Sequence, residues 1–548
     1  MLEGLMQNDY QLTLKHVLDR MRGPCADGEV VTLMDAEGGK TRASYGEVAE
    51  RVDALARGLE SLGVERGDRV ATFMWNSQPH LELYMAAPCM GAVLHMLNIR
   101  LFEEQLTYIA NHAQDKVVFV DDTLVPLLAK VAPSFETVEQ YVVVGDGDAS
   151  ALPNAIRYED LLAEHAGPYD YPELDERTAA GLCYTSGTTG NPKGVLYSHR
   201  SNVLHSLATG LADTTGVTAS DRVLPVVPMF HVNAWGLPYA CALVGADLVM
   251  PGQFLQPEPL ANLIKSERVT IAGAVPTVWL DLLSYADEHS PDLSSLETVV
   301  CGGSAVPESL MRAFQERHGV RIVQAWGMTE TSPLASIAHV PPGAEGEDQW
   351  AYRVRQGRPL PLVDTRLIGD DGEEVAWDGE TTGELEVSGP WIAAEYYEDP
   401  AGAEKFNDGW LRTGDIASID SRGYIRISDR AKDVIKSGGE WISSVDLENA
   451  LMAHPGVREA AVIARPDERW SERPLACVVP SGDEPCDPDD LREHLRKHVA
   501  KWWIPEQIVF IDEVPKTSVG KFDKKVLRKR LEEGTLEAKE KAGSAGAD

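Results

Sequence analysis

Residues 185–194 read Thr-Ser-Gly-Thr-Thr-Gly-Asn-Pro-Lys-Gly, and this stretch decides how the rest of the chain is interpreted. It combines four hydroxyl side chains, three glycines and one lysine in a single loop. Glycines let the backbone approach a ligand closely, and hydroxyl and N–H groups can hydrogen-bond phosphate oxygens beside the charge of Lys193. Because Gly194 follows the lysine, the loop is not the GxxxxGK[ST] loop of the ordinary nucleotide hydrolases. The stretch therefore predicts a phosphate-binding loop of another class.

The sequence around this loop predicts an α/β architecture. Residues 179–184, Ala-Ala-Gly-Leu-Cys-Tyr, are typical of a short buried strand, and a helical pattern begins at about His199. A loop between a strand and a helix is a common place to hold phosphate. Upstream, residues 44–47 fit a helix capping box, apolar residues at three- and four-residue steps follow, and 69–74 form the next expected strand. Such alternation of helices and strands favours α/β layers.

The carboxyl-terminal part of the chain has a different pattern. Short strand-like runs bounded by Gly and Asp fill residues 354–428 and predict a small β-rich subdomain. After residue 429 we expect a small, mobile α+β domain. Its expected elements are helices over 445–453 and 488–500 and strands over 460–464 and 475–479, and residues 541–548 have a disordered composition. We predict an N-terminal domain over 1–429 and a C-terminal lid domain over 430–548, with a hinge near Lys432.

Composition limits the class of protein. A chain of 548 residues is too long for one core and implies two or more domains. The 50 basic and 86 acidic residues give a net charge of −36, which disfavours nucleic acid or an anionic membrane as a primary partner. This charge fits either an ordinary soluble surface or adaptation to high salt. We find no apolar run long enough to span a membrane, no secretion signal, and seven scattered cysteines without CxxC spacing. We therefore expect a cytoplasmic protein without an integral membrane segment.

Four further motifs follow the first loop in a fixed order. They are Gln-Ala-Trp-Gly-Met-Thr-Glu at 324–330, Thr-Gly-Asp at 413–415, Asp-Arg-Ala-Lys-Asp-Val-Ile-Lys at 429–436 and Pro-Lys-Thr-Ser-Val-Gly-Lys at 515–521. In order and spacing the chain resembles the adenylate-forming enzymes: acyl-CoA synthetases, luciferases and peptide-synthetase adenylation domains. Residues 226–235 and 436–450 resemble most closely the bacterial and archaeal medium- and long-chain fatty acyl-CoA synthetases.

The resemblance implies two half-reactions, in which a carboxylate first attacks the α-phosphorus of ATP and CoA then takes the acyl group from the acyl-adenylate. It implies that the loop holds the ATP phosphates and that Thr185 and Glu330 hold Mg²⁺. It assigns Asp415 and Arg430 to the ribose. The loop residues concerned are Thr185, Ser186, Gly187, Thr188, Thr189, Gly190 and Lys193, and the adenine and α-phosphate pocket is formed by Gly303, Gln324, Ala325, Trp326 and Thr329. The family more often has tyrosine at position 326; tryptophan keeps an aromatic face for the purine and moves the polar atom.

Lys521 is the strongest catalytic candidate that the resemblance gives. A cation is needed between the attacking carboxylate and the α-phosphate, because both are anions. For the second half-reaction, relatives rotate the small domain and replace the Lys521 loop by another loop. The positions in this chain are Lys432 at the hinge, and Lys436, Gly438, Gly439 and Trp441 toward the adenylate and CoA.

The acyl substrate is less narrowly defined by sequence. The resemblance places His231, Val232 and Trp235 at the acyl site, and residues 229–240 contain no acidic side chain, which favours an uncharged tail over an amino acid. From the residues alone, Trp235 also fits a core position, Gly303 a plain turn and Lys521 a basic tail. Alternatives are a ligase for an aryl or short thioether acid (cinnamate-like or methylmercaptopropionate-like), a carrier-protein ligase, a luciferase-type oxidase, and a non-catalytic adenylate-binding protein. Relatives often form homodimers through the N-terminal region, so we also expect a homodimer.

Overall fold

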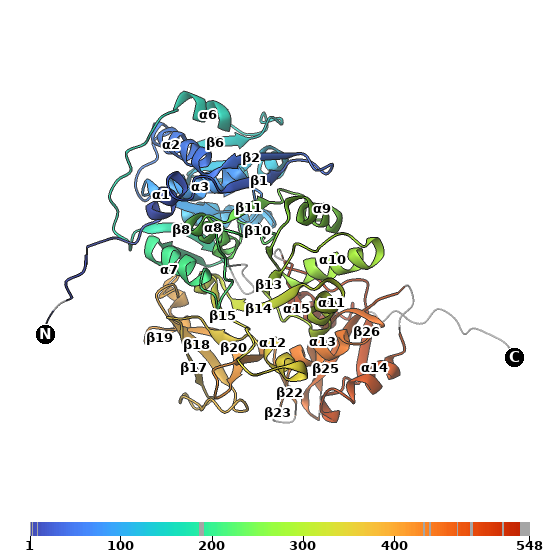
Figure 1. Ribbon diagram of the computed structural model, residues 1–548. Coiled ribbons are helices and arrows are strands. Elements are labelled where there is room, and N and C mark those ends of the chain that lie inside the picture. Colours follow the sequence, from blue (N-terminus) through green and yellow to red (C-terminus); the bar gives the residue numbers. More distant parts are fainter. Residues whose placement is uncertain are drawn as a thin grey trace.

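The computed structural model describes residues 2, 4–7, 9–185, 191–430, 433–437, 440–467, 469–482, 486–517 and 520–536, with residues 440 and 441 described by their backbone. Four sheets organise these residues (Figure 1). In the described part of the chain, no helix is long and apolar enough to cross a membrane.

The first large sheet has seven strands and carries the 185–194 loop. Its strands are parallel except for β9, which pairs antiparallel with β8. In spatial order they are β7 (Ala155–Arg157), β6 (Gln140–Val144), β5 (Asp115–Asp121), β3 (Arg69–Phe73), β4 (Val93–Met96), β8 (Ala179–Tyr184) and β9 (Gly194–Ser198). The predicted strand over 179–184 is thus confirmed, and the loop connects the antiparallel pair β8–β9.

The second large sheet has nine strands, of which the central ones are parallel and β2, β15 and β16 are antiparallel. The order is β16 (Arg358–Pro359), β15 (Leu334–Ile337), β14 (Arg321–Gly327), β13 (Thr298–Gly302), β12 (Ile271–Ala274), β10 (Arg222–Pro225), β11 (Asp247–Met250), β1 (Glu29–Leu33) and β2 (Lys40–Ser44). In an open α/β sheet, ligands bind outside the carboxyl ends of parallel strands. That edge is formed here by β12, β13 and β14.

Helices cover both faces of the second sheet. Successive side chains of a strand point to opposite faces, so apolar residues at neighbouring positions need a core on each side. Val223 and Leu248 face a core shared with the first sheet, whereas their neighbours Leu224 and Val249 face a second core. The shared core contains helices α1 (Lys15–Arg22), α2 (Tyr45–Ser61), α3 (Gln78–Cys89) and α8 (Leu237–Val244), beside α7 (His199–Thr209). The second core contains α9 (Pro257–Glu267), α10 (Pro276–His289) and α11 (Glu308–His318).

Helices α4 (Glu103–Ala113), α5 (Val125–Leu128) and α6 (Tyr158–Glu164) belong to the first sheet, and the short α12 (Trp350–Arg353) precedes β16. The capping box predicted at 44–47 is confirmed: the backbone N–H of Glu47 donates to Oγ of Ser44, and Glu47 accepts from the backbone N–H of Ser44 at 2.7 Å. The helix expected from about residue 199 is also confirmed as α7.

The third sheet is the predicted small β-rich part, and it borders the carboxyl edge of the second sheet (Figure 1). It is antiparallel and consists of β17 (Asp364–Ile368), β18 (Gly383–Ser388), β20 (Trp410–Ile419), β19 (Phe406–Asn407) and β21 (Ile425–Arg430), which pairs with β20. The register places Asp415 opposite Arg430, so two predicted ribose residues are neighbours across the sheet.

The fourth sheet and three helices form a small C-terminal α+β unit with its own apolar clusters. The strands are β23 (Glu440–Ile442), β22 (Ile435–Ser437), β25 (Ser471–Pro480), β24 (Val457–Asp467) and β26 (Gln507–Phe510); the helices are α13 (Ser444–Met452), α14 (Pro488–Leu495) and α15 (Lys524–Glu532). Helix α14 ends earlier than the predicted residue 500. Three-residue backbone bonds such as Lys497 N–H to His494 O and His498 N–H to Leu495 O replace the helix there.

This unit contacts the rest of the chain through the amino end of α13. The backbone N–H and the hydroxyl of Ser444 both donate to Oδ2 of buried Asp429, at 2.9 and 2.5 Å. The hydroxyl of Ser443 donates to the carbonyl of Ser428 at 2.6 Å. A helix amino end favours a carboxylate. These bonds join the last strand of the third sheet to the C-terminal unit on the two sides of residue 432.

Candidate active site

A single cavity of about 580 Å³ lies at the carboxyl edge of the second sheet. It is bounded by the end of β8, by β20 and β21, and by the segment around Lys521 of the C-terminal unit. Its lining contains most of the predicted residues: Thr185, Lys193, His231, Val232, Trp235, Gly303, Gln324, Ala325, Trp326, Thr329, Glu330, Asp415, Arg430 and Lys521. Segments more than 300 residues apart in sequence, such as Thr185 and Lys521, therefore meet at one place.

Some predicted residues are not brought to this cavity or lie outside the described residues. Lys436 is exposed on β22 and its backbone N–H donates to Glu472 at 2.7 Å, so it does not line the cavity in this arrangement. Outside the described residues lie Ser186, Gly187, Thr188, Thr189, Gly190, Lys432, Gly438 and Gly439, together with the side chain of Trp441. The expected disorder of 541–548 also falls outside them.

The two ends of the phosphate-loop candidate are tied together. The backbone N–H of Thr185 donates to the carbonyl of Lys193 at 2.9 Å, and the N–H of Lys193 donates to Oγ1 of Thr185 at 3.1 Å. The ammonium of Lys193 pairs with Asp399 at 3.2 Å and lies 4.7 Å from the ring centre of Tyr396. A substrate phosphate would compete with Asp399 for this lysine.

Glu330 follows β14 in a short 3-10 turn and is buried. The hydroxyl of Tyr396 donates to its Oε1 at 2.6 Å, and burial together with this carboxylate raises the pKa of Tyr396. No described residue donates to Oε2, and Glu330 shares the cavity lining with the hydroxyl of Thr185. A carboxylate oxygen and a hydroxyl are hard oxygen donors, which is the chemistry that Mg²⁺ requires. The residues present therefore fit the predicted magnesium site.

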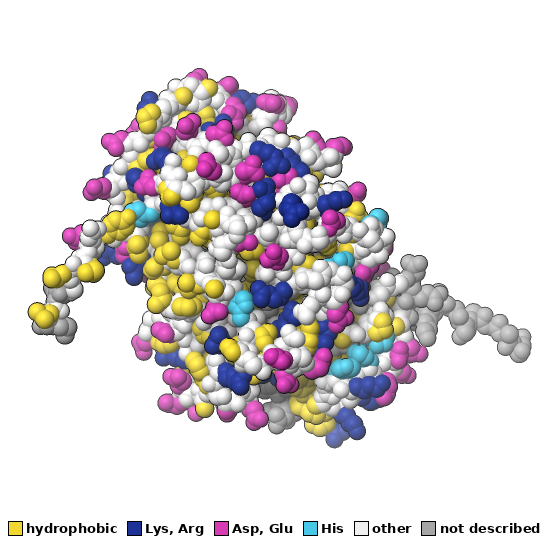
Figure 2. Space-filling model, viewed as in Figure 1, with side chains coloured by type: hydrophobic (Ala, Val, Ile, Leu, Met, Phe, Trp, Pro, Cys, Tyr) yellow, Lys and Arg dark blue, Asp and Glu magenta, His cyan; other side chains and the backbone are white. Residues whose placement is uncertain are grey.

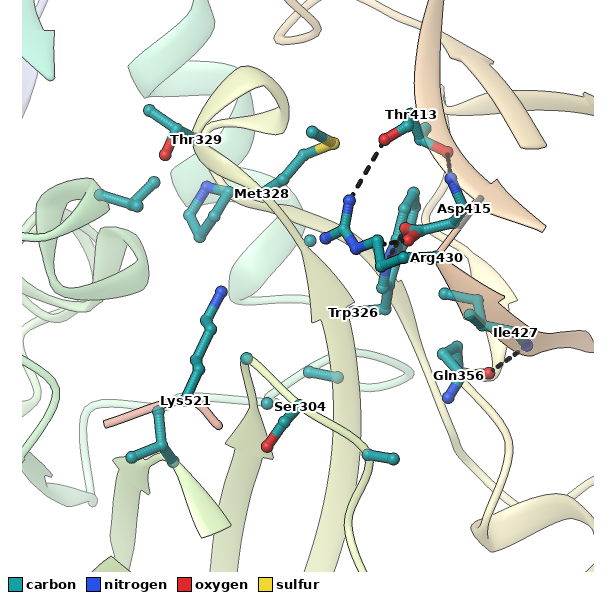
Figure 3. Close-up of a pocket in the computed structure, with 18 of the residues that line it drawn as sticks. Ser304, Trp326, Met328, Thr329, Gln356, Thr413, Asp415, Ile427, Arg430 and Lys521 are labelled. Carbon is teal, nitrogen blue, oxygen red and sulfur yellow. Dashed lines mark hydrogen bonds and ion pairs between the residues drawn. The ribbon is translucent and has the colours of Figure 1, made fainter. Parts of the chain in front are cut away.

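Asp415 is buried and held on two sides (Figure 3). Its Oδ2 accepts a hydrogen bond from Nε1 of Trp326 at 3.0 Å, and its Oδ1 pairs with Nε of Arg430 at 2.8 Å. Its own backbone N–H donates to Oγ1 of Thr413 at 3.1 Å. Burial raises the pKa of Asp415, and Arg430 and then Trp326 oppose that shift. Tryptophan at position 326 thus places its polar atom, Nε1, where it donates a hydrogen bond to this carboxylate, in contrast to the tyrosine that the family more often has.

Lys521 extends into the cavity from the side opposite Trp326, Asp415 and Arg430 (Figure 3). Its backbone is anchored by Thr517, which donates to the carbonyl of Lys521 at 2.7 Å. Burial lowers the pKa of Lys521 to about 8, with Arg430 adding to the shift and Asp415 opposing it. Among the described lysines and arginines of the lining, Lys521 and Lys405 are the two without a carboxylate ion-pair partner. Lys521 therefore has a positive charge available for an anionic ligand.

Part of the cavity lining is apolar. Val232, Trp235, Leu237, Val275 and Val300 contribute to it, and Val275 lies beside Lys521, since both are close to the Cβ position of Gly303. Side-chain atoms of the Trp235 indole lie 3.7 Å from the positions that a Cβ on Gly273 or Gly302 would take, so the ring packs over two glycines. Burial lowers the pKa of neighbouring His231 to about 3, with a contribution from the Lys521 charge, so this imidazole is neutral. These apolar side chains and the neutral imidazole can accept an uncharged tail.

The segment that carries Trp235 has unusual backbone. Val232, Asn233, Ala234 and Trp235 have φ angles of 47, 54, 45 and 60°, all in the left-handed region. L-residues with side chains avoid this region, at a cost of roughly 1–2 kcal/mol each. The amide of Asn233 bonds to the side-chain oxygen of Asn202 at 3.2 Å and anchors the turn to α7. Strain of this kind collects at functional sites.

Three residues at the site carry no signal that sequence reasoning used: Tyr396 and Lys405, which line the cavity, and Asp399, which pairs with the lining residue Lys193. Tyr396 and Asp399 contact Glu330 and Lys193, and Nζ of Lys405 lies 3.6 Å from the position of a Cβ on Gly414. All three belong to one irregular stretch whose aromatic and charged residues have no spacing that ties them to distant partners. An expectation that the acidic chain collects cations at its site is the one signal that could have drawn attention to Lys405.

Comparison with known protein families finds two matches on this chain. Residues 24–397 match the family described as AMP-binding enzyme, and residues 446–521 match the family described as AMP-binding enzyme C-terminal domain. Both matched regions contribute residues to the cavity.

Two curated proteins are similar over nearly the whole chain. A long-chain-fatty-acid–CoA ligase of Thermus thermophilus is 48% identical over 95% of this chain and 96% of its own length. A 3-methylmercaptopropionyl-CoA ligase of Ruegeria lacuscaerulensis is 44% identical over 94% of this chain and 97% of its own length.

Among solved structures, an anthranilate CoA ligase in complex with anthranoyl-AMP superposes with a TM-score of 0.87 at 25% identity, covering 97% of this chain and 99% of that one. The α/β layers and the small C-terminal domain predicted from sequence agree with this structure.

Proposed function

The chain belongs to the AMP-binding enzyme family and is an acid–CoA ligase, and we propose that its acid substrate is a medium- or long-chain fatty acid. The observation that supports the proposal most directly is one cavity whose lining combines charged and apolar side chains. Lys521, Lys193, Asp415 and Arg430 are among the charged ones, and Val232, Trp235 and Leu237 are among the apolar ones. A molecule activated there must carry a carboxylate on an apolar body.

In the proposed first half-reaction, a carboxylate oxygen of the acid forms a bond to the α-phosphorus of ATP and the bond to the β-phosphate breaks. Pyrophosphate leaves with the electron pair. Lys521 would lie between the carboxylate and the α-phosphate, where its charge offsets the repulsion of two anions. Its amine can meet this need because no described carboxylate pairs with it. Thr185 and Glu330 would hold Mg²⁺, which when bound neutralises phosphate charge.

The nucleotide would be oriented by residues of β14 and β20. Asp415 would accept hydrogen bonds from the ribose hydroxyls while Arg430 holds its other side. Gly303, Gln324, Ala325, Trp326 and Thr329 would surround the adenine and the α-phosphate. Lys193 would exchange Asp399 for a phosphate of ATP. With ligands fixed in this way, the two reacting groups are held in line and water is excluded.

In the proposed second half-reaction, the thiol sulfur of CoA forms a bond to the acyl carbon, the bond from that carbon to the phosphate oxygen breaks, and AMP leaves while the thiol proton is lost to solvent. Lys521 then has no further role, and we propose that the C-terminal domain, 430–548, turns about a hinge near Lys432. The turn would bring Lys436, Gly438, Gly439 and Trp441 to the acyl-adenylate. The position of Lys436 supports this proposal, because in the present arrangement that lysine is exposed and does not line the cavity.

A second candidate substrate is a short thioether acid, because a relative of 44% identity is a 3-methylmercaptopropionyl-CoA ligase. The apolar side chains of the lining suit both kinds of acid. His231, which is neutral, and Val232 would form the wall near the carboxyl group, and Trp235 would lie over the tail. A longer chain needs Trp235 to move.

We further propose a cytoplasmic homodimer. All seven cysteines are free and six are buried, which suits a reducing compartment. Apolar side chains lie along the extended N-terminal arm, visible at the left of Figure 2, with Leu2 100% and Leu5 93% exposed. Exposed apolar residues of this kind are typical of a surface that a second protein covers.

The experiment is CoA-dependent AMP formation from ATP and Mg²⁺, with acids from acetate to stearate, cinnamate and 3-methylmercaptopropionate, at low and high salt. A maximum between octanoate and palmitate is expected. A maximum with the thioether or the aryl acid would keep the mechanism and replace the substrate. No turnover with any acid would overturn the proposal.

A further inference from the structure

The indole N–H of Trp326 donates its hydrogen bond to a carboxylate, and not to a nucleotide base or to a backbone carbonyl. Most of the Trp326 ring belongs to an apolar cluster with Leu334, Leu385 and Val387, and 8% of the residue is exposed. Its Nε1 reaches the cavity edge and donates to Oδ2 of Asp415 at 3.0 Å (Figure 3). The side chain therefore joins the core to a buried acid.

Asp415 has its two oxygens approached from different directions. The Nε of Arg430 forms an ion pair with Oδ1 at 2.8 Å, and the Nε1 of Trp326 donates a hydrogen bond to Oδ2. An ionised carboxylate offers about four acceptor positions. With one position on each oxygen used, one on each oxygen is left, which suits two adjacent hydroxyl donors. A vicinal diol, such as the 2′- and 3′-hydroxyls of a ribose, has this donor pattern.

Arg430 alone would hold the Asp415 carboxylate in one orientation less firmly than Arg430 and Trp326 do together. The Arg430 side chain is 42% exposed, whereas Asp415 is nearly fully buried and Trp326 is held by its core packing. Arg430 also donates to the carbonyl of Thr413 at 3.3 Å, so its guanidinium is shared. The indole is the rigid member of the pair that orients the acid.

We propose that Trp326 is a positioning residue for nucleotide ribose, which acts by holding the Asp415 carboxylate in the orientation that accepts both hydroxyls. The inference rests on the proposed role of Asp415 in nucleotide binding. It differs from a stacking role of the ring, because it assigns the function to the N–H group.

The test is a cycle of variants and nucleotides. Trp326→Phe keeps an apolar ring and removes the donor. The matched control is Trp391→Phe: Trp391 lies in the same apolar cluster, is 1% exposed, does not line the cavity, and donates its Nε1 to a backbone carbonyl, that of Leu334, at 3.1 Å. Binding of AMP and of 2′,3′-dideoxy-AMP is measured by calorimetry for the three proteins, so that no acid substrate is needed.

We expect Trp326→Phe to weaken AMP binding roughly tenfold, the size expected for a bond to a charged group. Binding of dideoxy-AMP should change less than about twofold, because the contact that is being positioned is already missing. Trp391→Phe should leave both affinities unchanged. Equal weakening of both nucleotides by Trp326→Phe would overturn the inference in favour of stacking or packing, and so would an unchanged affinity for AMP.

Two controls keep the test decisive. If Trp326→Phe does not fold, Trp326→Tyr replaces it, since tyrosine keeps the ring and moves the polar atom; the same selective loss of AMP affinity is expected. If the wild-type protein binds AMP and dideoxy-AMP equally, the ribose role of Asp415 fails, and with it this part of the proposed function. If the wild type prefers AMP to dideoxy-AMP and Trp326→Phe keeps the same preference, the inference about Trp326 fails while the ribose role of Asp415 stands.

Discussion

Lys521 reaches the cavity over a residue that has no side chain: a Cβ built on Gly303 would lie 3.1 Å from Cε of Lys521. Gly303 follows β13 with a φ of 89°, and the same Cβ would lie 3.2 Å from Cγ1 of Val275. Position 303 thus has both a backbone reason and a space reason for glycine. A side chain at position 303 would crowd Lys521, whose amine the proposed first half-reaction depends on.

Gly303→Ala should therefore lower acyl-adenylate formation at least about tenfold, because a small displacement of a positioned group is costly in rate. Gly319→Ala is the control: Gly319 has a φ of 71° and nothing within 4 Å of its Cβ position. Both variants should lose stability in thermal melts through the positive φ, and Gly303→Ala should lose more, because only its Cβ meets close neighbours. The prediction fails if the two variants lose acyl-adenylate formation to the same extent.

Lys521→Ala should separate the two half-reactions. Pyrophosphate exchange dependent on the acid should fall by at least about 100-fold, since a preorganised charge at the reacting phosphate is lost. Thioester formation from supplied acyl-adenylate should stay within about threefold, because that step uses no contact of Lys521. Lys529→Ala, at a 73% exposed side chain of α15, is the control for the basic segment. A parallel loss of both half-reactions would contradict the assignment.

The pH dependence should report the same amine. Burial and Arg430 lower the pKa of Lys521 to about 8, so the free enzyme loses this positive charge as the pH rises through that value. The kcat/KM for ATP, which reports the free enzyme, should decline above about pH 8. Lys521→Arg keeps its charge, so its profile should stay flat over this range. A decline of equal size in the arginine variant would assign the alkaline limb to another group.

The contact between Ser444 and Asp429 should set the balance between domain orientations. Ser444→Ala removes one hydrogen bond to the buried Asp429 carboxylate, together with the bond that the same hydroxyl accepts from Lys524 within the C-terminal unit. The loss of the bond to Asp429 should destabilise the present arrangement by roughly 1–2 kcal/mol. We expect the ratio of thioester formation to acyl-adenylate formation to rise several-fold, as single-turnover rates of each step would show.

A matched serine tests that expectation. Ser201 lies in the first turn of α7, and its hydroxyl donates to the carbonyl of Ser198 at 2.9 Å within the N-terminal domain. Ser201→Ala should leave the ratio unchanged. If Ser444→Ala lowers both rates alike, its effect is one of packing and the contact does not select an orientation.

Sequence reasoning predicted the parts of this molecule that are encoded locally. The strand before Thr185, the capping box before α2 and the small C-terminal unit each have a pattern of a few neighbouring residues, and the structure has them all. Asp415 and Lys521 were predicted to lie at one site because their motifs resemble those of the adenylate-forming enzymes, and both line the cavity.

The remaining features depend on contacts that no local pattern contains. The bond from Trp326 to Asp415 joins residues 89 positions apart, and the bond from Tyr396 to Glu330 joins residues 66 apart. Intrinsic preferences also gave no warning of left-handed backbone at Val232, because β-branched residues disfavour it. The tertiary structure has to enforce such a conformation against the local preference.

The left-handed turn at residues 232–235 raises the conformational energy of the backbone that carries the Trp235 side chain. Four successive residues each carry roughly 1–2 kcal/mol of conformational energy that the folded domain already supplies. If a rearrangement moved the indole off Gly273 and Gly302 and returned those residues to right-handed backbone, it would release that energy. Moving Trp235 would then cost less than its packing suggests, and a long acyl chain would need to supply less of its own binding energy to enter.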